Sequence, residues 1–259
     1  MDAAFAVYVL LNGFIGACMG SFLNVVASRT VDGRPWWGTQ RSSCDSCGKV
    51  LGVLELIPLV SWLLQRGRCK SCGARIPARY PLAEAVSAVI GVSMAMRWGV
   101  SPAALLALLT GYFLLLNALT DIYSGYVYDL FAWGLGVVGL GFRLFGGMGP
   151  VLDGLLGMLL GGGLIVFIIF ASRGGMGWGD ASLMAGAGLA LGWKLTAAAL
   201  YAGFMFGGVV AVAMVLMKKA KRKDSMPLGP FLALGGIAAL IYGPAAVAFF
   251  GRTPGWPWG

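Results

Sequence analysis

Residues 102–121 read PAALLALLTGYFLLLNALTD, an apolar run that ends in an aspartate. A helix rises about 1.5 Å per residue, so a run of about 20 apolar residues can cross the ~30 Å hydrocarbon core of a membrane. Comparable runs recur along the 259-residue chain, which is 59% hydrophobic and only 11% charged and has a mean hydropathy of +0.83. The sequence therefore predicts an all-α polytopic membrane protein.

The apolar runs predict about eight transmembrane helices. Met1 and Asp2 precede the first run without a basic region or a small-residue cleavage site, so this run is interpreted as a membrane span rather than a cleaved signal. Gly192, Trp193 and Lys194 are the only turn signal near residues 190–197, which makes this division the weakest. The expected ranges are 3–28, 82–98, 102–120, 127–146, 151–172, 181–193, 195–217 and 230–250.

The helices suggest three parts: a first transmembrane helix at 1–28, a hydrophilic segment at 29–80 and a membrane-embedded domain at 81–259. With the N-terminus outside the cell, 15 of the 19 basic residues would fall in cytoplasmic loops, including those between 218 and 223. The positive-inside rule favours this orientation in the bacterial cell membrane. The outer side would keep Arg97, Arg143, Lys194 and Arg252.

The net charge of +9 does not indicate a nucleic-acid partner. The basic residues border membrane spans and form no groove with interleaved stacking aromatics. Anionic lipid headgroups are the favoured partner of this charge.

The hydrophilic segment carries four of the five cysteines, as Cys44-Asp-Ser-Cys47 and Cys69-Lys-Ser-Cys72. A glycine follows each pair, and 21 residues separate the pairs, a pattern typical of two turns that offer four thiolates to Zn²⁺. Two disulfides or four free thiols are the alternative, although disulfides are rare in the reducing cytoplasm. A segment of this size with few large apolar residues cannot close a core alone, so we expect a structural zinc site.

The chain contains no histidine, which removes Ser-His-Asp and Cys-His arrangements and histidine-bound catalytic zinc. Carboxylates at membrane depth are costly unless they are used or paired, and Asp121 and Asp180 each lie at the end of an apolar segment. Two neighbouring carboxyl groups can share one proton. The ionised group then activates water against an amide carbonyl while the protonated group donates to the carbonyl oxygen. The pair predicts aspartic peptide hydrolysis, at the cytoplasmic face in the expected topology.

Glycines precede Asp180 in the run Gly175-Met-Gly177-Trp-Gly179-Asp180, where they permit an unwound backbone and close approach of an extended substrate. A structural role is equally supported by this spacing: Asp180 would cap a helix that begins near Ala181. Asp129 lies eight residues after Asp121 and not on the same helix face, which favours a capping or orienting role.

Two further features have structural interpretations. Asp153 is expected to be a helix-start residue. Close helix packing is expected at Gly157, Gly161, Gly162 and Gly163.

Motifs along nearly the whole chain, in order, resemble those of the type IV prepilin peptidases. Asp121 precedes Tyr128-Asp129 as in that family, and the run ending at Asp180 matches its Gly-x-Gly-Asp signature. The other matching motifs are GSFLNVV at 20–26, the two cysteine pairs, IPLVSWL at 57–63, ARYPLAE at 78–84 and PLGPFL at 227–232.

The resemblance implies a bifunctional membrane enzyme. Such enzymes cleave the short basic leader of prepilins and type II secretion pseudopilins after a glycine, and methylate the new N-terminus with S-adenosylmethionine. Asp121 and Asp180 occupy the catalytic positions of the motif, with Gly177, Gly179 and Asp129 beside them. Tyr123 replaces a frequent acidic residue and Ser182 a frequent lysine, which affects specificity more than the reaction.

Two other functions remain open at this point. Another Gly-x-Gly-Asp intramembrane protease, resembling presenilin or signal peptide peptidase, would share the aspartates but would have no reason to carry the cysteine segment. A non-enzymatic transporter or assembly scaffold would use the aspartates to bind protons or cations. Asparagine substitution separates these classes, because it abolishes proteolysis only in an enzyme. The sequence pattern predicts no particular oligomeric state.

Overall fold

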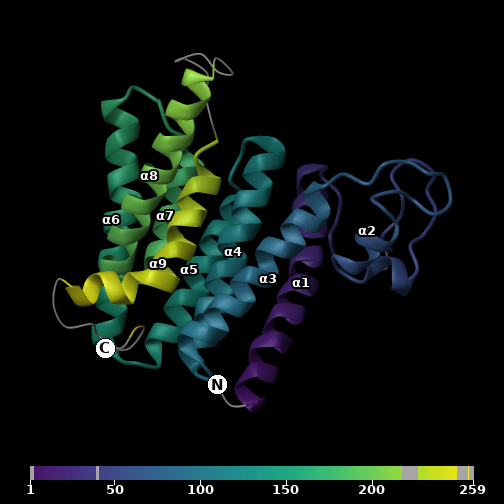
Figure 1. The fold of residues 1–259 in the computed structure, drawn as a ribbon. Helices are drawn as coiled ribbons and strands as arrows, with labels where there is room; N and C mark the ends of the chain where they lie inside the picture. The colour runs from purple at the N-terminus through teal and green to yellow at the C-terminus, as the bar shows by residue number, and fades with distance from the viewer. Residues whose placement is uncertain (1–2, 39–40, 218–226, 250–255, 257–259) are drawn as a thin grey trace. The chain divides into compact units, whose positions relative to one another are not determined.

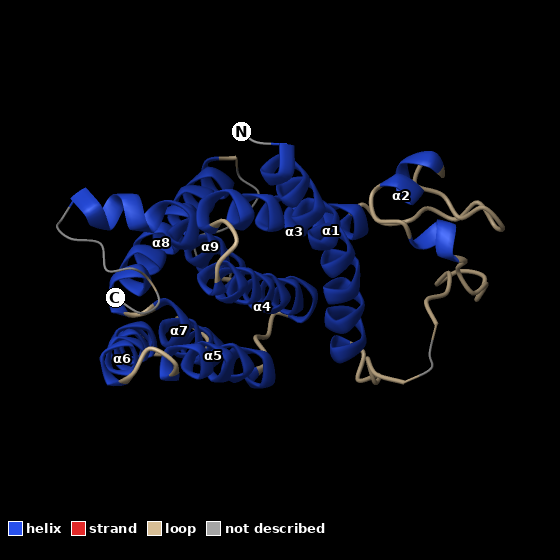
Figure 2. Ribbon diagram, turned by 90° about the horizontal axis from the view of Figure 1, so that it is seen from below, coloured by secondary structure: helices blue, strands red, loops and turns tan. Residues whose placement is uncertain are grey.

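The computed structural model describes residues 3–38, 41–217, 227–249 and 256. Helices and connecting loops account for these residues, apart from two isolated β-bridges (Figure 2). The chain divides into two compact units, Met1–Met96 and Arg97–Gly259. This division is a property of the described structure, and the three-part division at residues 28 and 80 remains a prediction.

The first unit holds two long helices and the hydrophilic segment between them (Figure 1). Its elements are α1 (Ala3–Val31), the 3₁₀ helix η1 (Val53–Leu56), α2 (Val60–Leu64) and most of α3 (Arg79–Trp98). Helices α1 and α3 pack closely at Gly20, where an added Cβ would lie 2.7 Å from the Cα of Glu84. Glycine is needed here because a side chain would push the two backbones apart.

The described residues of the second unit form six helices, α4 to α9, joined by loops. Ser101 caps the first of them by accepting a hydrogen bond from the backbone N–H of Ala104 (3.1 Å), and Gly125 ends it in the left-handed conformation (φ 73°). The helices are α4 (Pro102–Ser124), α5 (Asp129–Leu144), α6 (Met148–Ala171), α7 (Trp178–Leu191), α8 (Trp193–Leu216) and α9 (Gly229–Phe249).

All eight predicted helices are present, within about four residues of the expected ends. The division near residue 192 is also confirmed, because Gly192 has a φ of 78° and separates α7 from α8. By length and composition, α1, α4, α6 and α8 are long and apolar enough to cross a membrane. The fold is therefore that of an all-α, multi-pass membrane protein. Lys218, Lys219, Lys221, Arg222, Lys223 and Arg252 lie outside the described residues.

Helix α7 is the centre of the second unit, in contact with α4, α5, α6, α8 and α9. Of residues 180–191, all but Ser182 are buried. Glycines allow the close packing: a Cβ on Gly186 would lie 2.0 Å from the carbonyl oxygen of Ala132 on α5, and one on Gly188 would lie 2.3 Å from that of Gly157 on α6. A helix that carries almost no side chain on two faces fits only in this central position.

The predicted glycine contacts on α6 are confirmed for three positions and wrong for one. A Cβ on Gly157, Gly161 or Gly162 would lie within 2.9 Å of α7. Gly163 has no such neighbour within 4 Å, because its position on the helix turns it away from this contact.

Candidate active site and metal centre

Asp121 lies in the last turn of α4 and is only 5% exposed. Its Oδ2 is buried and has no hydrogen-bond partner among the residues that the structure describes. The first residue of α9 lies directly against it, since a Cβ on Gly229 would be 2.6 Å from Oδ2. The motif at 227–232 therefore meets the end of α4, and glycine at its centre leaves the space beside the carboxylate free of a side chain.

Asp180 lies in the first turn of α7 and is 8% exposed. Its Oδ2 accepts a hydrogen bond from the backbone N–H of Gly177 (3.3 Å), which is the residue before the helix. The expectation that Asp180 caps a helix beginning near Ala181 is therefore wrong in its details, because the helix begins at Trp178 and Gly177 occupies the cap position. Asp180 Oδ2 satisfies one free N–H at the start of this helix, and its other carboxylate oxygen is left for a further contact.

The glycines before Asp180 have different roles. Gly177 is extended (φ −78°, ψ 144°), in line with the expected unwound backbone before the helix. Gly179 is helical, and a Cβ there would lie 2.8 Å from the Cβ of Val127. The close approach predicted at Gly179 is thus made by the α4–α5 connection of the protein itself. This contact places Val127, two residues before Asp129, beside the first turn of α7.

Asp121 and Asp180, 59 positions apart in the sequence, are brought together by the packing of α4 against α7. They are close enough for a direct charge–charge interaction. Neither forms an ion pair with any of the described residues. Two nearly buried like charges without a cation are unfavourable unless the two groups share a proton.

Asp129 is the first residue of α5 and is exposed. Tyr128 occupies the cap position, so the predicted capping role of Asp129 is wrong and the orienting role stays a prediction. A carboxylate in the first turn stabilises a helix through its dipole.

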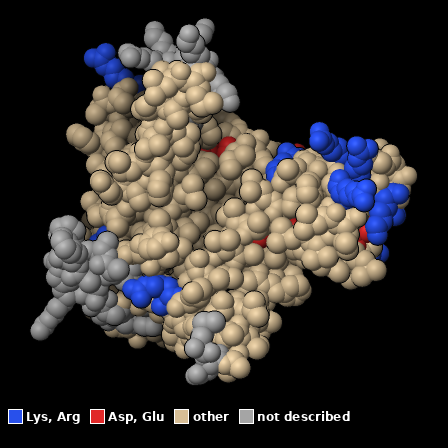
Figure 3. Space-filling model, in the orientation of Figure 1, with Lys and Arg blue, Asp and Glu red and all other residues tan. Residues whose placement is uncertain are grey.

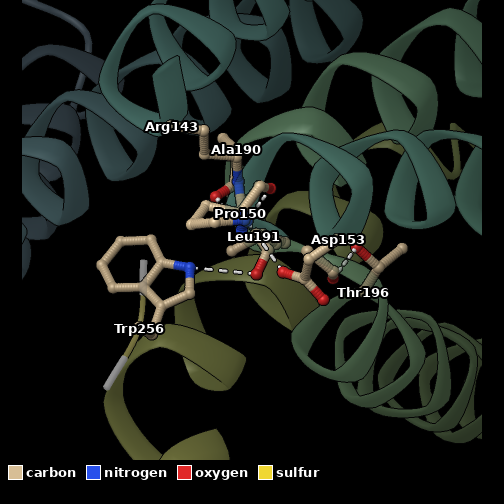
Figure 4. Close-up of polar contacts among 8 residues, drawn as sticks. Arg143, Pro150, Asp153, Ala190, Leu191, Thr196 and Trp256 are labelled. Carbon is tan, nitrogen blue, oxygen red and sulfur yellow. Dashed lines mark hydrogen bonds and ion pairs between the residues drawn. The ribbon is translucent and has the colours of Figure 1, made fainter. Parts of the chain in front are cut away.

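The opposite end of α7 is closed by a polar cluster whose members belong to no common sequence motif (Figure 4). Arg143, in the last turn of α5, is fully buried, and its Nη1 donates to Asp153 Oδ2 and to the carbonyl oxygen of Pro150, both at 2.8 Å. Its Nη2 donates to the carbonyl oxygen of Ala190 on α7 (3.1 Å). The expectation that Asp153 starts a helix is wrong, because α6 begins at Met148 and Asp153 pairs with Arg143 instead.

Side chains bind the last carbonyl groups of α7 as well. The Nε1 of Trp256 donates to the carbonyl oxygen of Leu191 (3.0 Å), and the Oγ1 of Thr196 donates to that of Gly192 (2.7 Å). The contact of Trp256 satisfies a carbonyl group that has no partner within α7, whereas the carbonyl of Gly192 also accepts the backbone N–H of Thr196 (2.9 Å) at the start of α8. A signal for part of the cluster was present, because Arg143 and Asp153 are ten residues apart across a short turn between two helices.

The two cysteine pairs form nearly identical turns. In each, the first cysteine's N–H donates to a carbonyl oxygen five residues later, and its own carbonyl accepts from the glycine four residues later, all at 2.9 Å. Gly48 and Gly73 have φ values of 70° and 71°, a conformation that glycine adopts without strain. The repeated Cys-x-x-Cys-Gly pattern thus builds two equal turns.

The four thiols converge on one point. The Sγ atoms of Cys44, Cys47, Cys69 and Cys72 all lie within 4.8 Å of one another, and Cys44 and Cys72 are 3.8 Å apart. The cysteines are free, so the disulfide alternative is not seen. Four sulfurs at about 2.3 Å from a tetrahedral Zn²⁺ would be about 3.8 Å apart, so the donor set fits this ion.

The electrostatics of the thiols also suit a cation. Backbone N–H groups of Cys72 and Ser71 lower the pKa of Cys69 to about 6. The N–H of Ala74 favours the thiolate of Cys72, but lost hydration and the three other thiols raise the pKa of Cys72 to about 11. One thiolate is therefore readily formed, whereas ionisation of the whole set requires a positive ion at its centre.

Comparisons with known proteins agree with these features. A family model described as the Bacterial Peptidase A24 N-terminal domain matches residues 14–98, which include all four thiols of the cluster. A second model, the Type IV leader peptidase family, matches residues 108–212, which include both aspartates. No solved structure matches the chain.

Curated relatives match most of the chain. The similar proteins include the prepilin leader peptidase/N-methyltransferases of Aeromonas hydrophila and Bacillus subtilis (strain 168). The first is 31% identical over 94% of this chain and 93% of the relative, and the second is 35% identical over 81% and 85%. The protein of the same name from Pseudomonas aeruginosa is 30% identical and covers 91% of both chains.

Proposed function

Because the chain belongs to the type IV leader peptidase family, we propose that it cleaves prepilin or pseudopilin precursors and methylates the N-terminus that cleavage exposes. The observation that carries the peptidase proposal is the meeting of Asp121 and Asp180, two nearly buried carboxyl groups that form no ion pair within the described part of the chain. Buried ionisable groups without a compensating partner are typical of sites that use them.

In the proposed reaction the two aspartates share one proton. The ionised carboxylate removes a proton from water as the water oxygen attacks the carbonyl carbon of the scissile bond. The protonated carboxyl group donates its proton to the carbonyl oxygen. Collapse of the tetrahedral intermediate then breaks the C–N bond, and the leaving amine takes up a proton, so that no metal is required in this step.

The surrounding backbone supports an approach of substrate to these carboxyl groups. Gly229 leaves free the space beside Asp121, and Gly177 precedes α7 in an extended conformation. We assign these glycines, with Gly179, a role in shaping the site and Asp129 a role in starting α5 beside it. A side chain at Gly229 would collide with Asp121 Oδ2, so only glycine allows α9 to begin this close to the carboxylate.

We propose that the thiol cluster holds a structural Zn²⁺. Four protein ligands leave no open coordination position, so the ion would fold the segment between α1 and α3 rather than activate water. The methyl donor would be S-adenosylmethionine, a co-substrate of the second activity, and we assign no residue to methyl transfer.

The proposed location is the bacterial inner membrane, with the aspartates and the thiol cluster at the cytoplasmic face and anionic lipids around the basic loops. The distribution of basic residues supports this orientation. The precursor's apolar helix would then lie in lipid, and the scissile bond would lie at the membrane boundary.

The first test is cleavage of a purified prepilin-like precursor by the detergent-solubilised protein, followed by mass spectrometry of the new N-terminus with and without S-adenosylmethionine. Cleavage after the leader glycine is expected, and methylation adds a methyl mass only when the donor is present. A folded protein that cuts no prepilin or pseudopilin precursor would contradict the proposal.

The zinc proposal has a separate test. We expect about one zinc per chain in freshly purified, reduced protein by elemental analysis, and its loss in Cys44→Ser, because three thiolates hold the ion much less tightly than four. Cys18→Ser is the matched control, since Cys18 lies on α1 outside the cluster and its removal leaves all four ligands. A wild-type protein without metal would contradict this part.

A further inference from the structure

The segment between α1 and α3 exposes apolar side chains beside its metal-binding turns. On α2, Val60, Leu63 and Leu64 are exposed and lie on one helix face, because positions three and four apart are neighbours. Val53 and Leu54 are exposed on η1, which contacts α2. These five side chains are called here the apolar rim; Leu54 is 75% and Leu64 79% exposed.

The other side of α2 is packed, so the rim is a surface of a folded element. The Nε1 of Trp62 donates to the carbonyl oxygen of Ile76 (3.3 Å), and a Cβ on Gly67 would lie 2.9 Å from the Trp62 ring. Ile76 in turn donates its N–H to the carbonyl of Gly67 (2.8 Å). The rim therefore points away from the small core of its segment, and exposed apolar clusters of this kind mark interaction sites.

The segment that carries the rim is basic. Residues 32–78 contain seven basic and three acidic residues, and all seven basic residues are exposed. Figure 3 shows Lys and Arg gathered over the part of the surface that carries α2. Two of the seven, Arg34 and Lys49, form ion pairs, with Asp32 and Glu55. The remaining five have no ion pair among the residues that the structure describes: Arg41, Arg66, Arg68, Lys70 and Arg75.

The rim is held next to a helix that returns toward the membrane. Glu84, nearly buried in the second turn of α3, accepts a hydrogen bond from the backbone N–H of Leu59 (2.7 Å), the residue that precedes α2. Leu59 has a φ of 63°, which is strained for a residue with a side chain, so this contact fixes an otherwise unfavourable turn. The start of α2 therefore cannot move far from the start of α3.

Aromatic residues lie where the segment leaves α1, as expected near a membrane–water interface. Trp36 and Trp37 follow the end of α1 by a few residues and form an edge-to-face pair, with ring centroids 5.2 Å apart. Tryptophan is enriched at membrane–water interfaces. Both connections of the segment therefore leave it close to a lipid boundary.

From these observations we propose that the apolar rim docks onto the anionic surface of the membrane in which α1 is embedded, with the rim inserted among the acyl chains and the basic residues on the headgroups. Exposed aliphatic side chains beside exposed Lys and Arg are the pattern of interfacial segments, whose binding combines buried apolar area with attraction to anionic lipids. Continuity of the segment with α1 makes the membrane the nearest apolar partner. The inference goes beyond the proposed function and is independent of the aspartates.

The test is amide hydrogen exchange of the zinc-loaded full chain in nanodiscs of phosphatidylglycerol and of phosphatidylcholine. We expect amides of residues 53–66 to exchange several-fold more slowly in phosphatidylglycerol. This difference should shrink in about 1 M salt, where the distance over which charges interact falls to about 3 Å. The thiol turn at 44–48, which carries no basic residue, serves as the internal reference, with equal exchange in both lipids. Equal exchange of residues 53–66 in both lipids would overturn the proposal.

Two charge reversals sharpen the test. Arg66→Glu, directly after α2, should remove most of the lipid-dependent protection, whereas Arg173→Glu, an exposed arginine of similar backbone conformation after α6, should leave it unchanged. Protection that appears only when a precursor is added would reject the lipid and identify the precursor as the partner. Cleavage is measured on the same samples, and loss of lipid protection with cleavage intact is expected for Arg66→Glu, which separates this result from a failed active site.

Discussion

The two ends of helix α7 treat buried charge in opposite ways. At the C-terminal end, Arg143 has a carboxylate partner and two backbone carbonyl acceptors. At the N-terminal end, Asp180 faces a second carboxylate, Asp121, and neither has a cation among the described residues. The charge of Arg143 is thus paired at one end of the helix, called here the satisfied end, whereas the carboxyl groups at the other, unsatisfied end have no cation among the described residues. The first cluster closes the end of a helix, and the second is the pair to which we assign the proposed chemistry.

The largest effect is expected at the unsatisfied end. Asp121→Asn or Asp180→Asn should lower kcat for precursor cleavage by about 10²–10⁴-fold, because an amide keeps the size of the carboxyl group but cannot exchange a proton with its neighbour. The temperature of thermal unfolding in detergent should be unchanged or shifted upward, since a neutral amide costs less to bury than an ionisable carboxyl group. Substantial cleavage by either purified variant would remove the pair from the mechanism.

The reverse pattern is expected at the satisfied end. Arg143→Met should lower the free energy of unfolding by about 3 kcal/mol, because it leaves the carboxylate of Asp153 and the carbonyl of Ala190 without their donor. Cleavage per folded molecule should remain within about threefold of the wild type, because Arg143 lies at the opposite end of α7 from the aspartates. Asp153→Asn is the milder comparison, as it keeps a hydrogen-bond acceptor for Arg143. An Arg143 variant of normal stability but lost activity would show that this end also serves the reaction.

Two glycines, Gly188 on α7 and Gly163 on α6, offer a matched comparison of packing. Gly188→Ala should destabilise the protein by about 1–3 kcal/mol, because the new methyl group would lie 2.3 Å from the carbonyl oxygen of Gly157. Gly163→Ala, on α6, meets no atom within 4 Å and should be neutral or stabilise by up to about 1 kcal/mol. Unfolding temperatures of the two variants, measured together, check this difference. Equal shifts would contradict the described packing of α6 on α7.

The smallest effect is expected at Asp129, which is exposed beside the unsatisfied end. Asp129→Asn removes a charge from the first turn of α5 and should cost about 0.3–1 kcal/mol of stability. Cleavage should fall by no more than about fivefold, in line with that energy. A loss as large as that of Asp121→Asn would move Asp129 into the catalytic group.

Much of the fold was predictable because hydrophobic length is a local property. The eight helices and the break at Gly192 follow from apolar runs and their turn residues, and the thiol cluster follows from two repeated cysteine turns with a glycine at the same place. Sequence position and residue type were sufficient for these elements, since each is decided by neighbours within a few residues.

The contacts between distant residues were less accessible. The contact of Gly179 with Val127 and that of Arg143 with Ala190 depend on how three helices pack, and no local pattern encodes that arrangement. The predicted start of α7, residue 181, lies three residues after the observed start at Trp178, because the first turn contains glycine and tryptophan rather than an apolar run. The aspartates were predicted as candidate catalytic residues from their residue type and motif. The contacts of Gly229 with Asp121 and of Gly177 with Asp180 are seen only in the three-dimensional structure.

The shortness of α7 affects how water reaches the aspartates. Its 14 residues extend roughly 21 Å, which is less than the ~30 Å thickness of the hydrocarbon layer. Other helices rather than lipid surround α7, so the bilayer does not have to thin around it. A helix of this length cannot reach both membrane surfaces, so at least one of its ends lies in a recess of the protein below the membrane surface. A recess at the end that carries Asp180 would admit the water consumed by hydrolysis without a channel through the whole protein.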